Sequence, residues 1–182
     1  MQSEHYLQDA MNQFRRLKEL ADKAVAQVAE EDLFTTLDTE SNSIATILKH
    51  LAGNMRSRWT DFLTSDGEKS DRNRDAEFVM EKGDTRERVR ERSELGWECL
   101  FAAVKSLAPE DLERTVFIRG EPHTVLQAIN RQLTHVAYHV GQILFLAKHF
   151  TEGKWQPLSI PRGKSEEFNA AMRKKVIKGG SN

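Results

Sequence analysis

The chain has 182 residues, of which 38% are hydrophobic and 30% are charged, and its formal net charge is −1. This composition is typical of one globular domain, residues 1–182, that is long enough to bury a core. The balanced charge argues against nucleic acid as a partner, and the lack of an apolar run of about 18 residues argues against a membrane-spanning helix.

Two long helices are predicted in the first third of the chain. One covers about residues 3–30, with Ser3 as its N-cap, and the other covers about residues 43–63. Apolar residues recur at helical spacing in both, as in amphipathic helices that cover a core. The two series are Leu7, Met11, Phe14, Leu17, Leu20, Ala21 and Ala24, then Ile44, Ile47, Leu48, Leu51, Met55, Trp59 and Phe62.

A long polar stretch, residues 64–83, follows the second helix. Loops of this length are uncommon in compact domains, but a crossover that joins the far ends of two parallel helices needs such a link. A third helix is then predicted over about residues 84–107, before Pro109. Its apolar residues are Val89, Trp97, Leu100, Phe101 and Val104.

A small hairpin is predicted between the third and fourth helices. Residues 115–118 (TVFI) have the composition of a short strand, residues 119–122 (RGEP) that of a turn, and His123 begins the return strand.

The fourth helix is predicted over residues 125–150, with Thr124 as its N-cap. Four amphipathic helices in one domain predict an all-α fold, a four-helix bundle. The tail, residues 151–182, contains Trp155 and Leu158, and we expect it to pack on the body of the domain.

The single cysteine and the amino-terminal residues indicate the compartment. Cys99 cannot form an internal disulfide, which favours a reducing environment. The first residues, MQSEHYLQDAMNQFRR, lack the basic start and apolar stretch of a secretory signal. We therefore expect a cytoplasmic protein in which Cys99 packs as a small apolar residue.

Three histidines form a candidate metal site. His135 and His139 lie one helical turn apart in the fourth helix, and His50 lies in the second. On a helical wheel each falls at the flank of the apolar stripe, where a side chain is half buried but reachable from a cleft. If the two helices are neighbours, three imidazoles can hold a divalent metal and leave coordination positions open. Such ligands suit zinc, nickel, copper, iron or manganese.

A structural interpretation stands beside this one. Histidines at helix flanks are often ordinary polar residues, and the pair is not the HExxH metalloprotease motif, because Val136 stands where that motif has glutamate. The alternative is a non-enzymatic, stress-related bundle with a structural or vestigial metal site. The remaining histidines, His5, His123 and His149, are not candidate ligands, and the sequence indicates no catalytic residue.

Other polar residues near the histidines are candidates for supporting roles. Asn54 and Gln142 can orient the imidazoles through hydrogen bonds. Several basic side chains can either attract an acidic co-substrate or simply be solvated. They are Lys49, Arg56, Arg58, Arg162 and Lys164.

The chain resembles the DinB-like superfamily of small bacterial four-helix proteins, and in particular its uncharacterised members. The resemblance rests on His50 within ILKHLAGNMRSRWTDFLTSDGEK, on HVAYHVGQI in the fourth helix, and on WQPLSIPRGKSEEFN in the tail. It implies an up-down-down-up bundle with a crossover after the second helix. It also implies a metal site formed by His50, His135 and His139 that binds zinc, nickel or another divalent ion.

The resemblance has implications for activity as well. Characterised DinB-like proteins include S-transferases and isomerases that use low-molecular-weight thiols, and many are homodimers. For this chain it implies a metal-dependent enzyme with a thiol co-substrate and a small-molecule substrate, and a homodimer. A metal on three imidazoles can activate a thiol or acidify water, and the resemblance favours the thiol.

Overall fold

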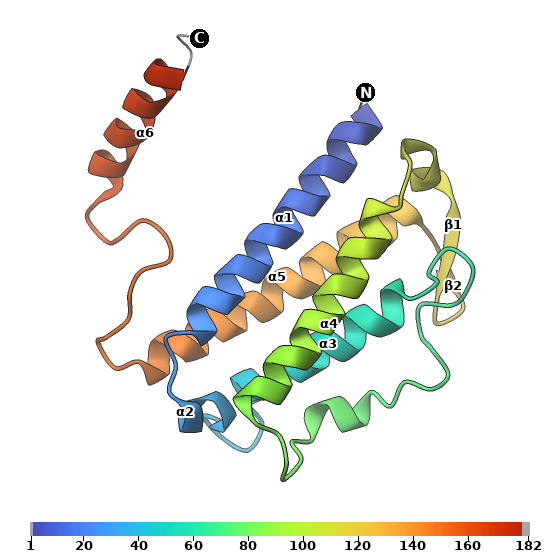
Figure 1. Ribbon diagram of the computed structural model, residues 1–182, viewed down its shortest axis with the longest axis horizontal. Helices are drawn as coiled ribbons and strands as arrows, with labels where there is room; N and C mark the ends of the chain where they lie inside the picture. Colours follow the sequence, from blue (N-terminus) through green and yellow to red (C-terminus); the bar gives the residue numbers. More distant parts are fainter. Residues whose placement is uncertain (1, 180–182) are drawn as a thin grey trace.

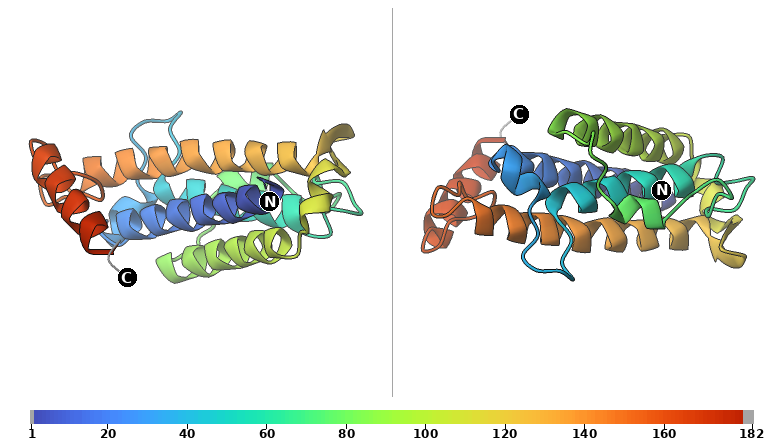
Figure 2. Two further views of the ribbon diagram at one scale, coloured as in Figure 1. Left: turned by 90° about the horizontal axis from the view of Figure 1, so that it is seen from above. Right: turned by 90° about the horizontal axis from the view of Figure 1, so that it is seen from below.

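The computed structural model describes the backbone of residues 2–179 and the side chains of residues 3–174. The fold is mostly helical with one small hairpin, as expected for the all-α class (Figure 1). Four long helices lie side by side (Figure 2). They are α1 (Gln2–Val25), α3 (Ile44–Trp59), α4 (Arg86–Lys105) and α5 (Val125–Phe150). None of the helices in the described part of the chain combines the length and apolar character needed to span a bilayer.

The direction of the helices explains the long link between α3 and α4. Figure 1 shows α1 and α5 running one way and α3 and α4 running the other way. The two parallel helices α3 and α4 pack against each other, as do α1 and α5, and α3 also contacts α5. The contact between α3 and α5 is the condition under which the three histidines can meet.

The first helix is shorter than its periodicity predicts. It was expected to reach residue 30, but α1 ends at Val25, and a second short helix, α2 (Glu30–Phe34), follows. The turn buries Val28 and Leu33 in the core. Burial of these two apolar side chains contributes to the stability of the turn and the short helix.

The second helix also ends early. It was expected to reach residue 63, but α3 ends at Trp59, and Asp61 takes a positive φ of 47°. The turn folds Phe62 back, so that its ring centroid lies 4.8 Å from that of Trp59 and its side chain is buried. The start of α3 is as expected, because the Ser43 side chain accepts a hydrogen bond from the Thr46 amide.

The hairpin is formed by β1 (Thr115–Ile118) and β2 (Glu121–Thr124). The first strand has the predicted bounds, but the turn is tighter than the predicted residues 119–122. Only Arg119 and Gly120 form it, with φ values of 57° and 75°, and a two-residue turn with two positive φ values matches the twist of paired strands. The predicted N-cap of α5 is confirmed, since Thr124 and Gln127 form a capping box.

The crossover between α3 and α4 contains a short 3-10 helix, η1 (Asp75–Phe78), and is tied down at both sides. Ser57 of α3 donates a hydrogen bond to the carbonyl of Gly67 at 2.9 Å. The carboxylate of Asp66 accepts hydrogen bonds from the amides of Arg119 and Gly120, each at 2.8 Å. The polar link is therefore an ordered wall beside the end of α3 and the hairpin.

The tail is divided into two parts. Trp155 and Leu158 pack partly buried against the core, whereas Ile160 is largely exposed. Beyond them α6 (Ser165–Gly179) stands apart from the long helices (Figure 1), and its residues 165–174 are exposed. The carboxy-terminal residues 180–182 lie outside the described part of the chain.

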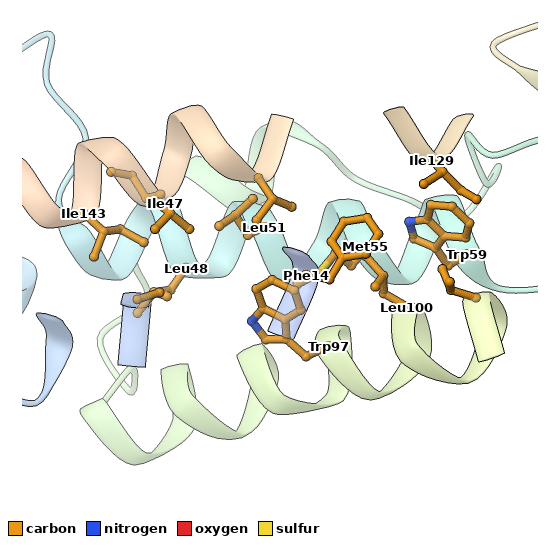
Figure 3. Close-up of a cluster of buried hydrophobic side chains, with 14 of the residues drawn as sticks. Phe14, Ile47, Leu48, Leu51, Met55, Trp59, Trp97, Leu100, Ile129 and Ile143 are labelled. Carbon is orange, nitrogen blue, oxygen red and sulfur yellow. The ribbon is translucent and has the colours of Figure 1, made fainter. Parts of the chain in front are cut away.

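The core is built from all four long helices, which contribute the side chains in Figure 3. Phe14 of α1, Leu51 of α3, Leu100 of α4 and Ile129 of α5 are almost fully buried. Helices α3 and α4 lie in close contact at Gly96, where an added Cβ would lie 2.8 Å from the Cα of Ala52. The parallel pair therefore depends on the lack of a side chain at this position.

We predict that Gly96→Ala lowers the free energy of unfolding by about 1–3 kcal/mol, because the new methyl group meets backbone rather than a movable side chain. Gly141→Ala is the matched control in α5, where nothing lies within 4 Å of an added Cβ. It should raise stability by about 0.4–1 kcal/mol through helix propensity. Denaturant unfolding of both variants checks this, and equal effects would contradict the close approach of α3 and α4.

Candidate metal centre

The three predicted histidines meet between α3 and α5. One ring nitrogen from each of His50, His135 and His139 lies within 4.8 Å of the others. His50 Nε2 and His135 Nε2 lie 3.2 Å apart. His50 and His139 are buried and His135 is half-buried. The cluster brings together the ligand set expected from the sequence.

The separation of one nitrogen pair fits a divalent ion, whereas the cluster as a whole, which spans up to 4.8 Å, would contract slightly for one ion to contact all three rings. An ion bound at about 2.0–2.1 Å from two imidazole nitrogens holds them about 3.0–3.4 Å apart, which includes the observed 3.2 Å. His139 Nε2 is buried without a hydrogen-bond partner among the described residues. Buried polar atoms in native proteins nearly always have a partner, so this orphaned nitrogen indicates a missing one.

His135 and His139 are in the charge state that metal binding needs. Burial lowers the pKa of His135 to about 3, and the neighbouring His139 and His50 add to this effect. Burial lowers the pKa of His139 to about 4, although the hydrogen bond with Gln142 opposes the shift. Both rings are therefore neutral near pH 7, and a neutral imidazole has a lone pair to donate.

Two side chains orient the rings. Gln142 Oε1 accepts a hydrogen bond from His139 Nδ1 at 2.8 Å, as the sequence predicts. Glu77 Oε2 accepts one from His50 Nδ1 at 2.8 Å. In each of these two rings Nδ1 therefore carries the proton, and Nε2 has the lone pair that can coordinate a metal. Asn54, the other predicted orienting residue, instead accepts a hydrogen bond from Gln132 Nε2 at 3.2 Å.

Glu77 was not predicted from the sequence, because it lies in η1 within the crossover. The feature of the sequence that could have indicated Glu77 is Gly53, which lies one turn after His50 in α3. A Cβ at Gly53 would overlap the Glu77 carboxylate, so the glycine leaves room for it against the helix backbone. A glycine inside a helix costs stability and therefore indicates close packing at that position.

Glu77 is held in turn by Arg72 of the crossover. Arg72 Nε lies 2.7 Å from Glu77 Oε1, and Nη2 lies 2.9 Å from Oε2, a bidentate pair. Burial alone would raise the pKa of Glu77, but the hydrogen bonds with His50 and Arg72 outweigh it and lower that pKa. Glu77 is therefore an ionised acceptor that fixes the ring of His50.

The histidines lie in the wall of a cavity of about 440 Å³, which also borders α5, the crossover and the hairpin. Of the basic residues singled out in the sequence, Arg58 lines this cavity. Lys49 contacts Val79, Glu81 and Asp84 instead. Arg162 and Lys164 lie in the tail, away from the cavity, and Arg56 faces a different hollow.

The fold and the cluster define a mostly helical protein with a three-histidine candidate metal site. The chain belongs to a family described as a protein of unknown function (DUF1572), whose model matches residues 1–164. That range contains all three histidines, Glu77 and the arginines of the crossover. No curated protein matches the chain.

We predict that Glu77→Ala, measured with a chelator present, lowers the free energy of unfolding by about 1–3 kcal/mol, because it removes the bidentate partner of the buried Arg72 guanidinium, which then keeps only the shared carboxylate of Glu68. Glu81→Ala is the control from the same crossover. Its side chain is 67% exposed and lies 3.8 Å from Lys49, so its loss should cost less than about 0.5 kcal/mol. Equal costs in chemical denaturation would contradict the role given to Glu77.

Proposed function

We propose that this protein is a divalent-metal-dependent enzyme that activates a low-molecular-weight thiol for transfer to a small electrophile. The observation that carries the proposal is the cluster itself: three imidazole nitrogens within 4.8 Å of one another, in the wall of a cavity. A structural site tends to be closed by a fourth protein ligand, whereas a catalytic site keeps a position open. Within the described residues no fourth histidine, cysteine or carboxylate joins the cluster.

Each residue of the site has a stated part in this proposal. His50, His135 and His139 would hold the ion, which when bound would lower the pKa of a thiol and supply it as the nucleophilic thiolate. Glu77 and Gln142 keep two of the rings in the tautomer that exposes Nε2. The cavity also has apolar lining. This lining includes Trp59, Phe62, Phe78, Val116 and Ile118.

The proposal includes the relationship to the DinB-like superfamily and its up-down-down-up four-helix bundle. The helix directions in Figure 1, the long crossover after α3 and the histidine positions support it. The preference for a thiol over water rests on that relationship, because three imidazoles suit either chemistry. The choice among zinc, nickel and other divalent ions is open to measurement.

Elemental analysis of protein purified without a histidine tag tests metal binding. We expect about one divalent ion per chain in the wild type and near-complete loss in His135→Ala, because two imidazoles bind far more weakly than three. His149→Ala is the control, since His149 is exposed on the same helix and lies outside the cluster. Equal metal content in wild type and His135→Ala would remove the site from the proposal.

A conjugation assay tests the thiol chemistry. With 1-chloro-2,4-dinitrobenzene, a thiolate forms the carbon–sulfur bond and chloride leaves. We expect metal-loaded protein to accelerate this reaction with at least one of glutathione, bacillithiol or mycothiol, and chelation or His135→Ala to return the rate to background. Tight metal binding without turnover with any of the three thiols would instead support the non-enzymatic alternative.

The expected homodimer and cytoplasmic location remain predictions. The outer face of α5 offers one surface for such a dimer, because Tyr138 and Phe145 are 54% and 66% exposed there. These two side chains lie seven residues apart, about two helical turns, and so share one face.

A further inference from the structure

We propose that the cavity beside the three histidines binds the anionic group of a small molecule, a carboxylate or a phosphate, through Arg58, Arg119 and Arg131. This inference deepens the proposed function, because the molecule would be its substrate or thiol co-substrate. It depends on the charges and the unpaired donors of the cavity wall rather than on the metal.

The wall of the cavity is strongly cationic. No aspartate or glutamate is among the residues that line it, whereas five arginines are: Arg58, Arg72, Arg74, Arg119 and Arg131. Within the described chain these arginines form ion pairs with only two carboxylates, Glu68 and Glu77. The wall therefore keeps an excess of positive charge, in a protein whose net charge is −1. A concave, partly desolvated surface of one sign concentrates ligands of the opposite sign.

The arginines share their carboxylates unequally. Arg72 has the bidentate pair with Glu77, while Glu68 lies 3.1 Å from Arg58 and 3.2 Å from Arg119 as well as 3.1 Å from Arg72. One carboxylate thus serves three guanidinium groups. Arg131, on α5 one turn before His135, forms no ion pair with any described residue. Arg74 also lacks an ion pair within the described chain but lies over the ring of Phe78, 4.9 Å from its centroid. Arg58 and Arg119 share one carboxylate and Arg131 has none, so the charges of these three groups are incompletely compensated.

Arg58 has a buried guanidinium with one nitrogen, Nη1, that lacks a hydrogen-bond partner among the described residues. Its side chain is only 10% exposed, and the contact of Nη1 with Glu68 lacks the geometry of a hydrogen bond. Burial lowers the pKa of Arg58, and the positive charges of Arg72, Arg119 and Arg131 lower it further, against the effect of Glu68. A buried guanidinium held among other guanidinium groups is stabilised by any anion that enters the cavity.

The unpaired buried atoms of the molecule gather at this cavity. Five buried side-chain nitrogen or oxygen atoms in the described chain have no hydrogen-bond partner, and four belong to residues that line the cavity. Two are ring nitrogens of His135 and His139. The other two, Arg58 Nη1 and Trp59 Nε1, can only donate hydrogen bonds, so the ligand that satisfies them must supply acceptor atoms.

Carboxylates and phosphates meet these demands together. Both accept several hydrogen bonds and pair with the planar guanidinium in a bidentate manner. A volume of about 440 Å³ suits a small organic molecule. Because the arginines and the histidines line one cavity, a single molecule can contact both.

Calorimetric titration of the full-length chain tests the inference. Succinate and inorganic phosphate are the probes, and neutral succinamide is the matched control for succinate. The titration is performed with chelated protein, so that direct anion–metal bonds do not contribute, and is repeated with metal-loaded protein. We expect binding of at least one anion and no binding of succinamide. The better anion identifies the group as a carboxylate or a phosphate.

Charge-removing variants locate the binding. Arg131→Gln should weaken anion binding about tenfold, because it removes a charge-assisted contact. Arg131 is exposed, so the variant should fold normally, whereas Arg58→Gln tests the buried group. Arg16→Gln, in an exposed position on α1 outside the cavity, should leave binding unchanged.

Failure of either proposal can be recognised separately. Absence of binding by both anions, or unchanged binding in Arg131→Gln, would overturn the anion site and leave the metal content of the protein unaffected. Anion binding that depends on Arg131 in a protein that retains no metal would uphold the anion site while the proposed metal chemistry fails.

Discussion

The contact between α3 and α5 is the interaction on which the candidate site depends. It places His50 of one helix beside His135 and His139 of the other, with His50 Nε2 and His135 Nε2 3.2 Å apart. Both helices contribute buried apolar side chains to the core, such as Leu51 of α3 and Ile129 of α5 (Figure 3). Hydrophobic burial therefore provides the energy that holds three polar rings together.

A chain of hydrogen bonds and ion pairs, buried at one end and exposed at the other, connects this contact to the rest of the cavity. It runs from His50 to Glu77, then to Arg72 and Glu68, and ends at Arg119 of the hairpin turn. Buried ion pairs contribute little net stability, because desolvation offsets the attraction between the charges, but they are strongly directional. The crossover therefore serves less to stabilise the fold than to set the orientation of one histidine and the charge of the cavity.

Local patterns in the sequence predicted much of the fold and the histidine cluster. The periodicity of apolar residues located the four long helices, and Thr124 marked the start of α5, because both depend on residues close in sequence. The early ends of α1 and α3 were missed, since the burial of Val28 and Phe62 depends on distant packing. Glu77 and the arginine cluster were missed for the same reason: pairs such as His50 and Glu77 leave no periodic signal.

X-ray absorption spectroscopy of the full-length protein loaded with one equivalent of zinc tests the central claim most directly. The scattering from the first coordination sphere should require three imidazole rings with nitrogens at about 2.0–2.1 Å, together with oxygen ligands from water. A sphere with sulfur from Cys99, or with at most one imidazole, would contradict the convergence of His50, His135 and His139 on one ion.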